Sequence, residues 1–72
     1  MSHVPQTAEN LVRIGTNVTI SKEANFMPQT LENIVRIARG TGVQVTIHGE
    51  GHMPQTLENL ARIGGKNVTI VI

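Results

Sequence analysis

A six-residue segment recurs three times in this 72-residue chain and constrains the fold more than any other feature. It reads Pro-Gln-Thr-(Leu/Ala)-Glu-Asn and begins at Pro5, Pro28 and Pro54. Each copy is followed by an apolar-Arg-Ile segment and then by a short Val-Thr-Ile stretch. Repetition at this spacing is typical of stacked supersecondary units. We therefore predict one domain, 1–72, made of three repeats at about residues 4–21, 27–48 and 53–72.

The first part of each repeat has the pattern of a short amphipathic helix. Proline suits the first helical turn, and apolar residues then recur at helical spacing. Glycines follow at the expected helix ends. The apolar stripes are Ala8, Leu11 and Val12; Leu31, Ile34, Val35 and Ala38; and Leu57, Leu60 and Ala61. The second helix is expected to be about one turn longer than the others.

The second part of each repeat alternates apolar and polar residues, as one-sided strands do. One face would hold Val18 and Ile20; Val43, Val45 and Ile47; and Val68, Ile70 and Ile72. Asn, Gln, Thr, Ser and His residues, together with Val71, would occupy the other face, with Thr19, Thr46 and Thr69 side by side. We predict an α/β chain of order αβαβαβ with right-handed crossovers, a three-stranded parallel sheet of order 1-2-3 and all helices on one face. The other face is expected to be polar and open, as in a short solenoid.

Polar residues that recur in every repeat are interpreted as scaffold. Thr7, Thr30 and Thr56 are placed to cap the first helical turn, and Glu-Arg pairs stand four residues apart at 9/13, 32/36 and 58/62. Asn10, Asn33 and Asn59 are expected to form ladders between units. A catalytic residue would be expected once rather than three times.

Composition excludes several classes of function. The formal charge is +1, with no basic run and one aromatic residue, which disfavours nucleic acid as a partner. The chain has no cysteine and no apolar stretch long enough to span a membrane. No signal-peptide pattern stands at the N-terminus, so a cytoplasmic location is expected. No cofactor is predicted.

One loop carries residues that could bind a metal ion. His48, Glu50 and His52 form His-x-Glu-x-His at the carboxyl end of the second strand, and imidazole and carboxylate groups suit zinc or another first-row metal. A packing role is the alternative, because His52 aligns in the repeat with Phe26 and His3. Flexible glycines also separate the three candidate ligands.

The same loop offers a second candidate site, for an anion. Gly49 and Gly51 lie between a strand and the start of a helix, where backbone N–H groups and the helix dipole could hold negative charge. The pattern is weak, since the equivalent loop 21–25 contains no glycine.

The last strand is expected to be an unprotected sheet edge. Thr69, Ile70, Val71 and Ile72 carry no charge, and no capping repeat follows them in this sequence. We therefore predict a homo-oligomer through these residues, either a twofold dimer, which is favoured, or a closed ring.

These observations favour a small non-enzymatic structural or protein-interaction module that associates with itself. The alternative is a metal- or anion-dependent small-molecule binder or enzyme that uses His48, Glu50 and His52. The segment Pro-Gln-Thr-Leu-Glu-Asn is identical in the second and third copies, which also fits a recent duplication or a designed chain.

Overall fold

The computed structural model describes residues 5–21 and 26–72. His3, which aligns in the repeat with Phe26 and His52, and the loop residues 22–25 lie outside the described part. The elements are α1 (Pro5–Ile14), β1 (Val18–Ile20), α2 (Pro28–Thr41), β2 (Val45–His48), α3 (Pro54–Gly64), the short 3-10 helix η2 (Gly65–Asn67) and β3 (Val68–Val71). The predicted α/β class with three helices is confirmed.

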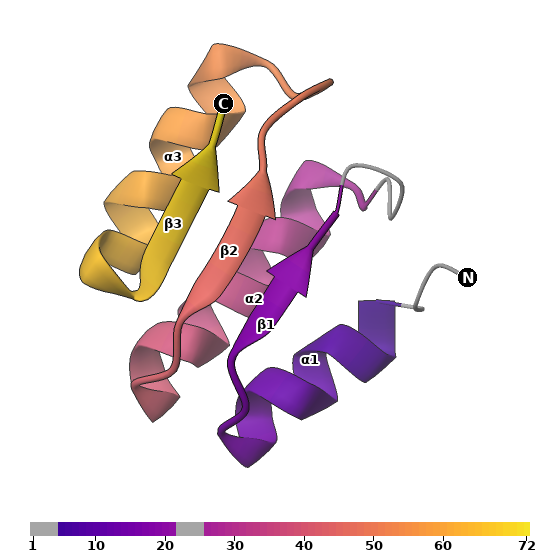
Figure 1. Ribbon diagram of the computed structural model, residues 1–72, viewed down its shortest axis with the longest axis vertical. Helices are drawn as coiled ribbons and strands as arrows, with labels where there is room; N and C mark the ends of the chain where they lie inside the picture. The colour runs from indigo at the N-terminus through magenta and orange to yellow at the C-terminus, as the bar shows by residue number, and fades with distance from the viewer. Residues whose placement is uncertain (1–4, 22–25) are drawn as a thin grey trace.

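The three strands form one parallel sheet in the order β1-β2-β3, as predicted (Figure 1). Val18 is opposite Val45, and Val45 is opposite Val68. The threonines follow the same register, so Thr19, Thr46 and Thr69 stand side by side across the sheet. Equivalent residues of the three repeats therefore occupy equivalent places in the sheet.

α2 packs against both other helices and is the longest of the three, with 14 residues against 10 in α1 and 11 in α3. Its end is set by Gly42, whose φ of 79° and ψ of 15° place it in the left-handed region. The Gly42 N–H donates to the Ala38 carbonyl oxygen at 2.8 Å. Glycine adopts this conformation without steric cost, so the chain turns here toward β2.

The core lies between the helices and the sheet and is centred on the second unit. All four predicted apolar residues of α2 are buried, and Val45 and Ile47 of β2 are completely covered. The remaining buried hydrophobic residues are Ala8, Val12, Ile20, Phe26, Val43 and Leu60. The middle unit is therefore enclosed by its two neighbours.

Burial at the ends of the sheet differs from the sequence prediction. Ala61, expected in the apolar stripe of α3, is exposed. Ile72, expected on the covered face of the last strand, lies just beyond β3 and is fully exposed at 103%. Among the described helices α3 packs mainly against α2, which leaves Ala61 uncovered, whereas Ile72 follows Val71, the last paired residue of β3.

Gly64 lies where α3 comes close to both α2 and β3. A Cβ atom at this position would lie 2.5 Å from Val35 Cγ1 and 3.0 Å from Val68 Cβ. The sequence suggested only that this glycine ends the helix. The structure adds a packing reason, because even a single Cβ atom at this contact would require Val35 or Val68 to shift.

Candidate functional site

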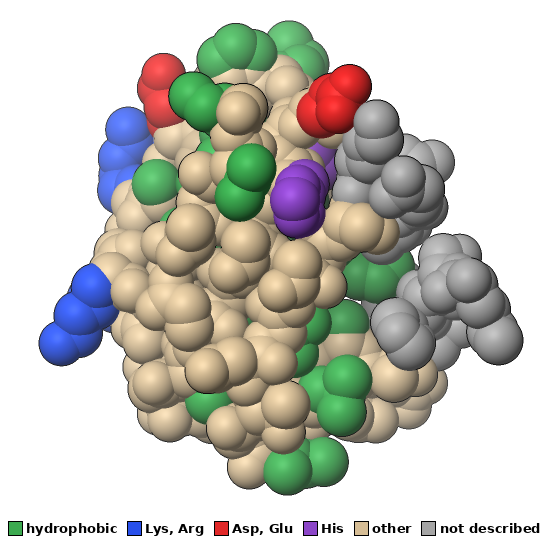
Figure 2. All heavy atoms as spheres, viewed as in Figure 1, with side chains coloured by type: hydrophobic (Ala, Val, Ile, Leu, Met, Phe, Trp, Pro, Cys, Tyr) green, Lys and Arg blue, Asp and Glu red, His purple; other side chains and the backbone are tan. Residues whose placement is uncertain are grey.

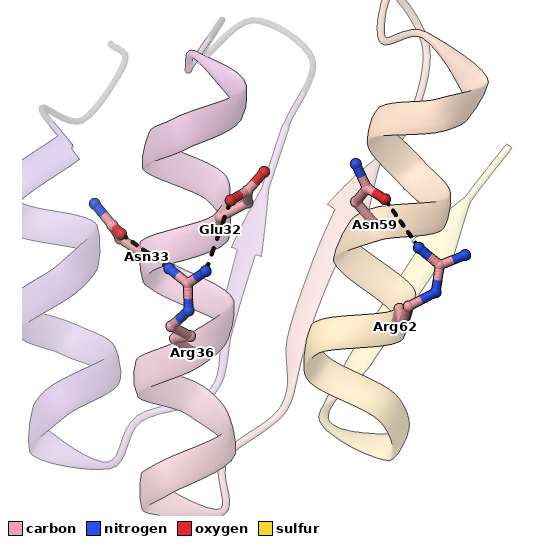
Figure 3. Close-up of polar contacts among 5 residues, drawn as sticks. All are labelled: Glu32, Asn33, Arg36, Asn59 and Arg62. Atoms are coloured by element: carbon pink, nitrogen blue, oxygen red, sulfur yellow. Dashed lines mark hydrogen bonds and ion pairs between the residues drawn. The ribbon is translucent and has the colours of Figure 1, made fainter.

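The recurrent polar residues of the helices bond within their own helix rather than between units. Arg13 Nη1 donates to Asn10 Oδ1 at 3.0 Å in α1, and Arg62 Nη1 donates to Asn59 Oδ1 at 3.1 Å in α3. The equivalent bond in α2 joins Arg36 Nη1 to Asn33 Oδ1 at 3.5 Å. Figure 3 shows the α2 and α3 pairs. The predicted asparagine ladders between units are therefore wrong.

The predicted Glu-Arg ion pairs appear in one helix. Within the described residues, Glu32 and Arg36 form such a pair, with 3.8 Å between Oε1 and Nη2 (Figure 3). In α1 and α3 the arginine bonds to the asparagine three residues earlier and not to the glutamate four residues earlier.

The repeated threonines do not cap α2 and α3. The residues at the N-cap positions are Met27 and Met53, and neither position has a side-chain cap hydrogen bond. Thr30 and Thr56 stand two residues after the proline, inside the first turn. The cap oxygen normally comes from the residue before the helix, so the capping prediction for these two helices is wrong.

Contacts between units form at the amino ends of the strands instead. Asn17 Oδ1 accepts from the Gln44 N–H at 2.8 Å, and Asn67 Nδ2 donates to the Val43 carbonyl oxygen at 3.0 Å. Gln44 Nε2 also donates to Thr69 Oγ1 at 2.7 Å. These side chains stand one residue before each Val-Thr-Ile segment and join neighbouring strands where the ladder begins.

The longer end of α2 makes two further contacts, one to each neighbouring helix. Arg39 Nη1 donates to the Ile63 carbonyl oxygen of α3 at 2.9 Å. Thr41 Oγ1 lies 3.2 Å from the Val12 carbonyl oxygen of α1 and donates within its own helix at similar distances. The extra turn of α2 therefore binds carbonyl groups near the ends of both flanking helices.

The predicted metal ligands lie at the end of β2 and in the turn after it, but they do not form a cluster in the structure. His48 is half-buried on β2 opposite Val71, Glu50 is exposed in the turn, and His52 is half-buried. Across residues 5–21 and 26–72, no group of three His, Cys, Asp or Glu side chains could hold a metal ion. The described part of the chain thus offers no geometric support for the metal prediction.

Gly49 has a structural role that bears on the predicted anion site. Its N–H donates to the Val71 carbonyl oxygen at 2.8 Å and extends the pairing of β2 with β3. A Cβ atom here would lie 2.8 Å from Leu57 Cδ1. The Gly49 N–H is therefore not directed at an anion while this strand pair is intact, and exposed Gly51, with a φ of 90°, remains as a turn residue.

The side of the sheet seen in Figure 1 carries few charged groups. Side chains that are neither hydrophobic nor charged, together with backbone, cover the centre of this view in Figure 2. The charged side chains lie around its margins. This surface lacks the tyrosine, tryptophan and arginine anchors that dominate most protein interfaces.

β3 is the outer strand of the sheet and pairs with β2 alone among the described strands. The Val71 carbonyl accepts from Gly49, so it points toward β2. Because successive residues of a strand direct their backbone groups to opposite sides, those of Ile70 and Ile72 point to the open side. The segment 68–72 has no charge and no proline to block pairing there.

Comparison with known proteins finds no match: no family model, no curated protein and no solved structure matches the chain. None of the helices within residues 5–21 and 26–72 is long and apolar enough to cross a membrane.

Proposed function

We propose that this chain is a non-enzymatic structural module that assembles with copies of itself through the open edge of β3. The observation that carries the proposal is the one-sided hydrogen bonding of β3, combined with the exposed apolar side chains of Val71 and Ile72 beside that edge. Unpaired N–H and C=O groups in a row form a template for another strand. A partner strand would satisfy these groups and cover apolar surface in one step.

The architecture that we propose for the module is a short solenoid-like layer of three repeats, with helices on one face and a polar open face. Two features support it. The repeats stand in one register across the sheet, and the adjacent helices and strands of neighbouring units account for the main contacts. A solenoid of this kind buries the faces of its inner unit and leaves its two end faces for a cap or a partner.

A scaffold role also fits the repeated polar residues. The Asn-Arg pairs recur in all three helices, and the asparagines before β1 and β3 bond to the backbone of the second unit. Each of these groups is engaged in holding a helix or a strand pair. They stabilise the same contact in more than one unit, which is what stacking requires and what a single active centre does not.

The proposal is tested by the molar mass in solution, measured by light scattering over a wide range of concentration. We expect a defined assembly of two or a few copies that is unchanged by a chelator. A monomer at all concentrations would refute self-association. An assembly that dissociates on chelation would instead support the metal-dependent alternative.

A matched pair of variants at Ile72 tests the role of the strand edge. Ile72→Pro removes an N–H that points to the open side, whereas Ile72→Ala keeps it, and the fully exposed side chain contributes nothing to the core in either case. We expect the proline variant to dissociate at concentrations at least about tenfold higher than the alanine variant, which corresponds to about 1.4 kcal/mol. Equal dissociation constants would mean that the assembly does not use this edge.

A further inference from the structure

We infer that the partner at the β3 edge is β1 of a second copy, paired in parallel, so that copies join head to tail in the register in which the units of one chain already join. This inference rests on the self-association proposed above and names the surface that the second copy contributes. It is carried by the pattern of burial at equivalent positions of the three repeats.

One side of α1 and of α2 is covered by the unit that follows it. Val12 and Val35 occupy the same repeat position in α1 and α2, and both are fully buried. Val35 lies against Gly64 of the next helix, which shows that this position faces the following unit. The equivalent residue of α3 is Ala61, which is exposed. The third unit therefore presents, uncovered, the surface that the first two units use to receive a successor.

The opposite side of α2 and of α3 is covered by the unit that precedes it. Ile34 of α2 and Leu60 of α3 are fully buried, whereas the equivalent Leu11 of α1 is only half-buried. Ile14, three residues after Leu11, is likewise less buried than its equivalents in the other two helices. It is 78% exposed, although its equivalents in α2 and α3 are packed against the core. The first unit therefore presents, uncovered, the surface with which the other two contact a predecessor.

The backbone groups at the two sheet edges complement each other in the same way. The Val18 N–H donates to the Gln44 carbonyl oxygen, so Val18 faces β2 and Thr19 faces the outer side of β1. On β3 the residues that face outward are Ile70 and Ile72. Between β1 and β2, the backbone groups that face each other belong to the Val and Ile residues of β1 and to the Gln and Thr residues of β2. The outer edges of β3 and β1 offer this same combination.

A head-to-tail contact explains both uncovered surfaces, whereas a twofold contact explains one. Pairing two β3 strands across a twofold axis would place the exposed Ala61 side of α3 beside its own copy and leave Leu11 and Ile14 uncovered. In the head-to-tail arrangement, α1 of the next copy covers α3 as α2 covers α1. Repetition of this heterologous contact closes a ring when the rotation per copy allows it.

The register predicts which residues meet across the joint. If the order Val18, Val45, Val68 continues, Thr69 of one copy stands beside Thr19 of the next, as Thr46 stands beside Thr69 within one chain. The chain has no cysteine, so single-cysteine variants can be crosslinked without background. Both threonines are exposed, and neither contributes to the core.

The test uses Thr19→Cys and Thr69→Cys, one of them labelled with ¹⁵N, mixed and treated with a short bifunctional thiol reagent. Intact mass then distinguishes the mixed product from either homodimer. We expect at least about fivefold more mixed product than homodimer, with Thr46→Cys, on the central strand, as the unreactive control. The concentrations match those at which light scattering shows assembly.

Each other outcome overturns the inference in a recognisable way. A Thr69–Thr69 product alone would establish the twofold contact and leave the proposed self-association standing. No crosslinking in a sample that light scattering shows to be assembled would place the contact on another surface. No crosslinking in a monomeric sample would refute both the inference and the proposed function.

A second pair of variants tests the α1 side, which a twofold β3 contact does not use. Ile14→Arg places a charge on the exposed α1 surface, and Gln6→Arg adds the same charge at another exposed position of α1. We expect the first to weaken assembly at least about tenfold more than the second. Equal effects would contradict the head-to-tail contact, and circular dichroism of both variants confirms that the fold is retained.

Discussion

Gly64 and Gly40 provide a test of the packing in which one substitution should have opposite effects at two positions. Both glycines lie within helices, in α3 and α2 respectively, and neither has a positive φ. Alanine has the higher helix propensity, by up to about 1 kcal/mol in a helix interior. At Gly40 nothing lies within 4 Å of the added Cβ, so Gly40→Ala should raise the free energy of unfolding by about 0.5–1 kcal/mol.

At Gly64 the gain in helix propensity is opposed by overpacking. The added Cβ would lie 2.5 Å from Val35 Cγ1 and 3.0 Å from Val68 Cβ. Val35 is completely buried, so it cannot move away without displacing other core residues. Overpacking of this kind typically costs about 1–3 kcal/mol. After a propensity gain of up to about 1 kcal/mol is subtracted, Gly64→Ala should lower the free energy of unfolding by up to about 2 kcal/mol.

The measurement is thermal and urea unfolding of the two variants and the parent at one fixed concentration, because association shifts apparent stability. For a domain of this size, 1 kcal/mol corresponds to a midpoint shift of about 4–8 °C. We expect Gly40→Ala to unfold above the parent and Gly64→Ala below it. If both variants are stabilised by similar amounts, α2, α3 and β3 do not meet as closely as described, and the packing argument fails.

Two further predictions concern polar contacts. Asn67→Asp removes the donor to the Val43 carbonyl, whereas Asn17→Asp keeps its acceptor oxygen, so the first should lower the free energy of unfolding by about 1 kcal/mol more than the second in urea titrations. A similar loss in both would show that the direction of these bonds is unimportant. Glu32→Gln breaks a partly exposed ion pair with Arg36 and should cost at most about 0.5 kcal/mol, a difference that 1 M salt should remove. A larger loss that persists in salt would mean that Glu32 has another role.

The sequence was sufficient to predict the order of elements and the strand register because both follow from periodicity. Apolar spacing distinguishes helix from strand, and a parallel sheet of order 1-2-3 is the simple outcome of short right-handed crossovers. The alignment of Thr19, Thr46 and Thr69 follows from the repeat itself. These features depend on the pattern of a whole segment rather than on any single side chain.

Predictions for individual polar side chains were less successful because several partners compete at similar distances. The spacing of Glu and Arg suggested an ion pair in each helix, yet Arg13 and Arg62 bond to asparagines. Sequence spacing does not determine which rotamer the arginine adopts. The threonine caps failed for a different reason, since the threonines lie inside the first turn rather than before it.

Contacts made by unrepeated residues do not follow from the repeat, because the repeat predicts only what the three units share. Arg39 and Thr41 lie in the extra turn of α2, which on sequence grounds looks like simple variation in helix length. The structure shows that this turn reaches α3 and α1. Two features of the sequence point to these contacts. The helix of the central unit is longer than the other two, and its extra turn carries the hydrogen-bonding side chains of Arg39 and Thr41. The candidate sites around His48 and Gly49 depend on loop geometry that sequence cannot determine.

The strand order has a consequence for the way the chain folds. Cα partners are 27 residues apart between β1 and β2 (45 − 18) and 23 residues apart between β2 and β3 (68 − 45). Among the described strands, no pairing joins the first unit directly to the third. Each pairing therefore closes a loop about one unit long, and either pair can form before the other. The entropic barrier to completing the sheet is set by the length of a unit rather than by the length of the chain.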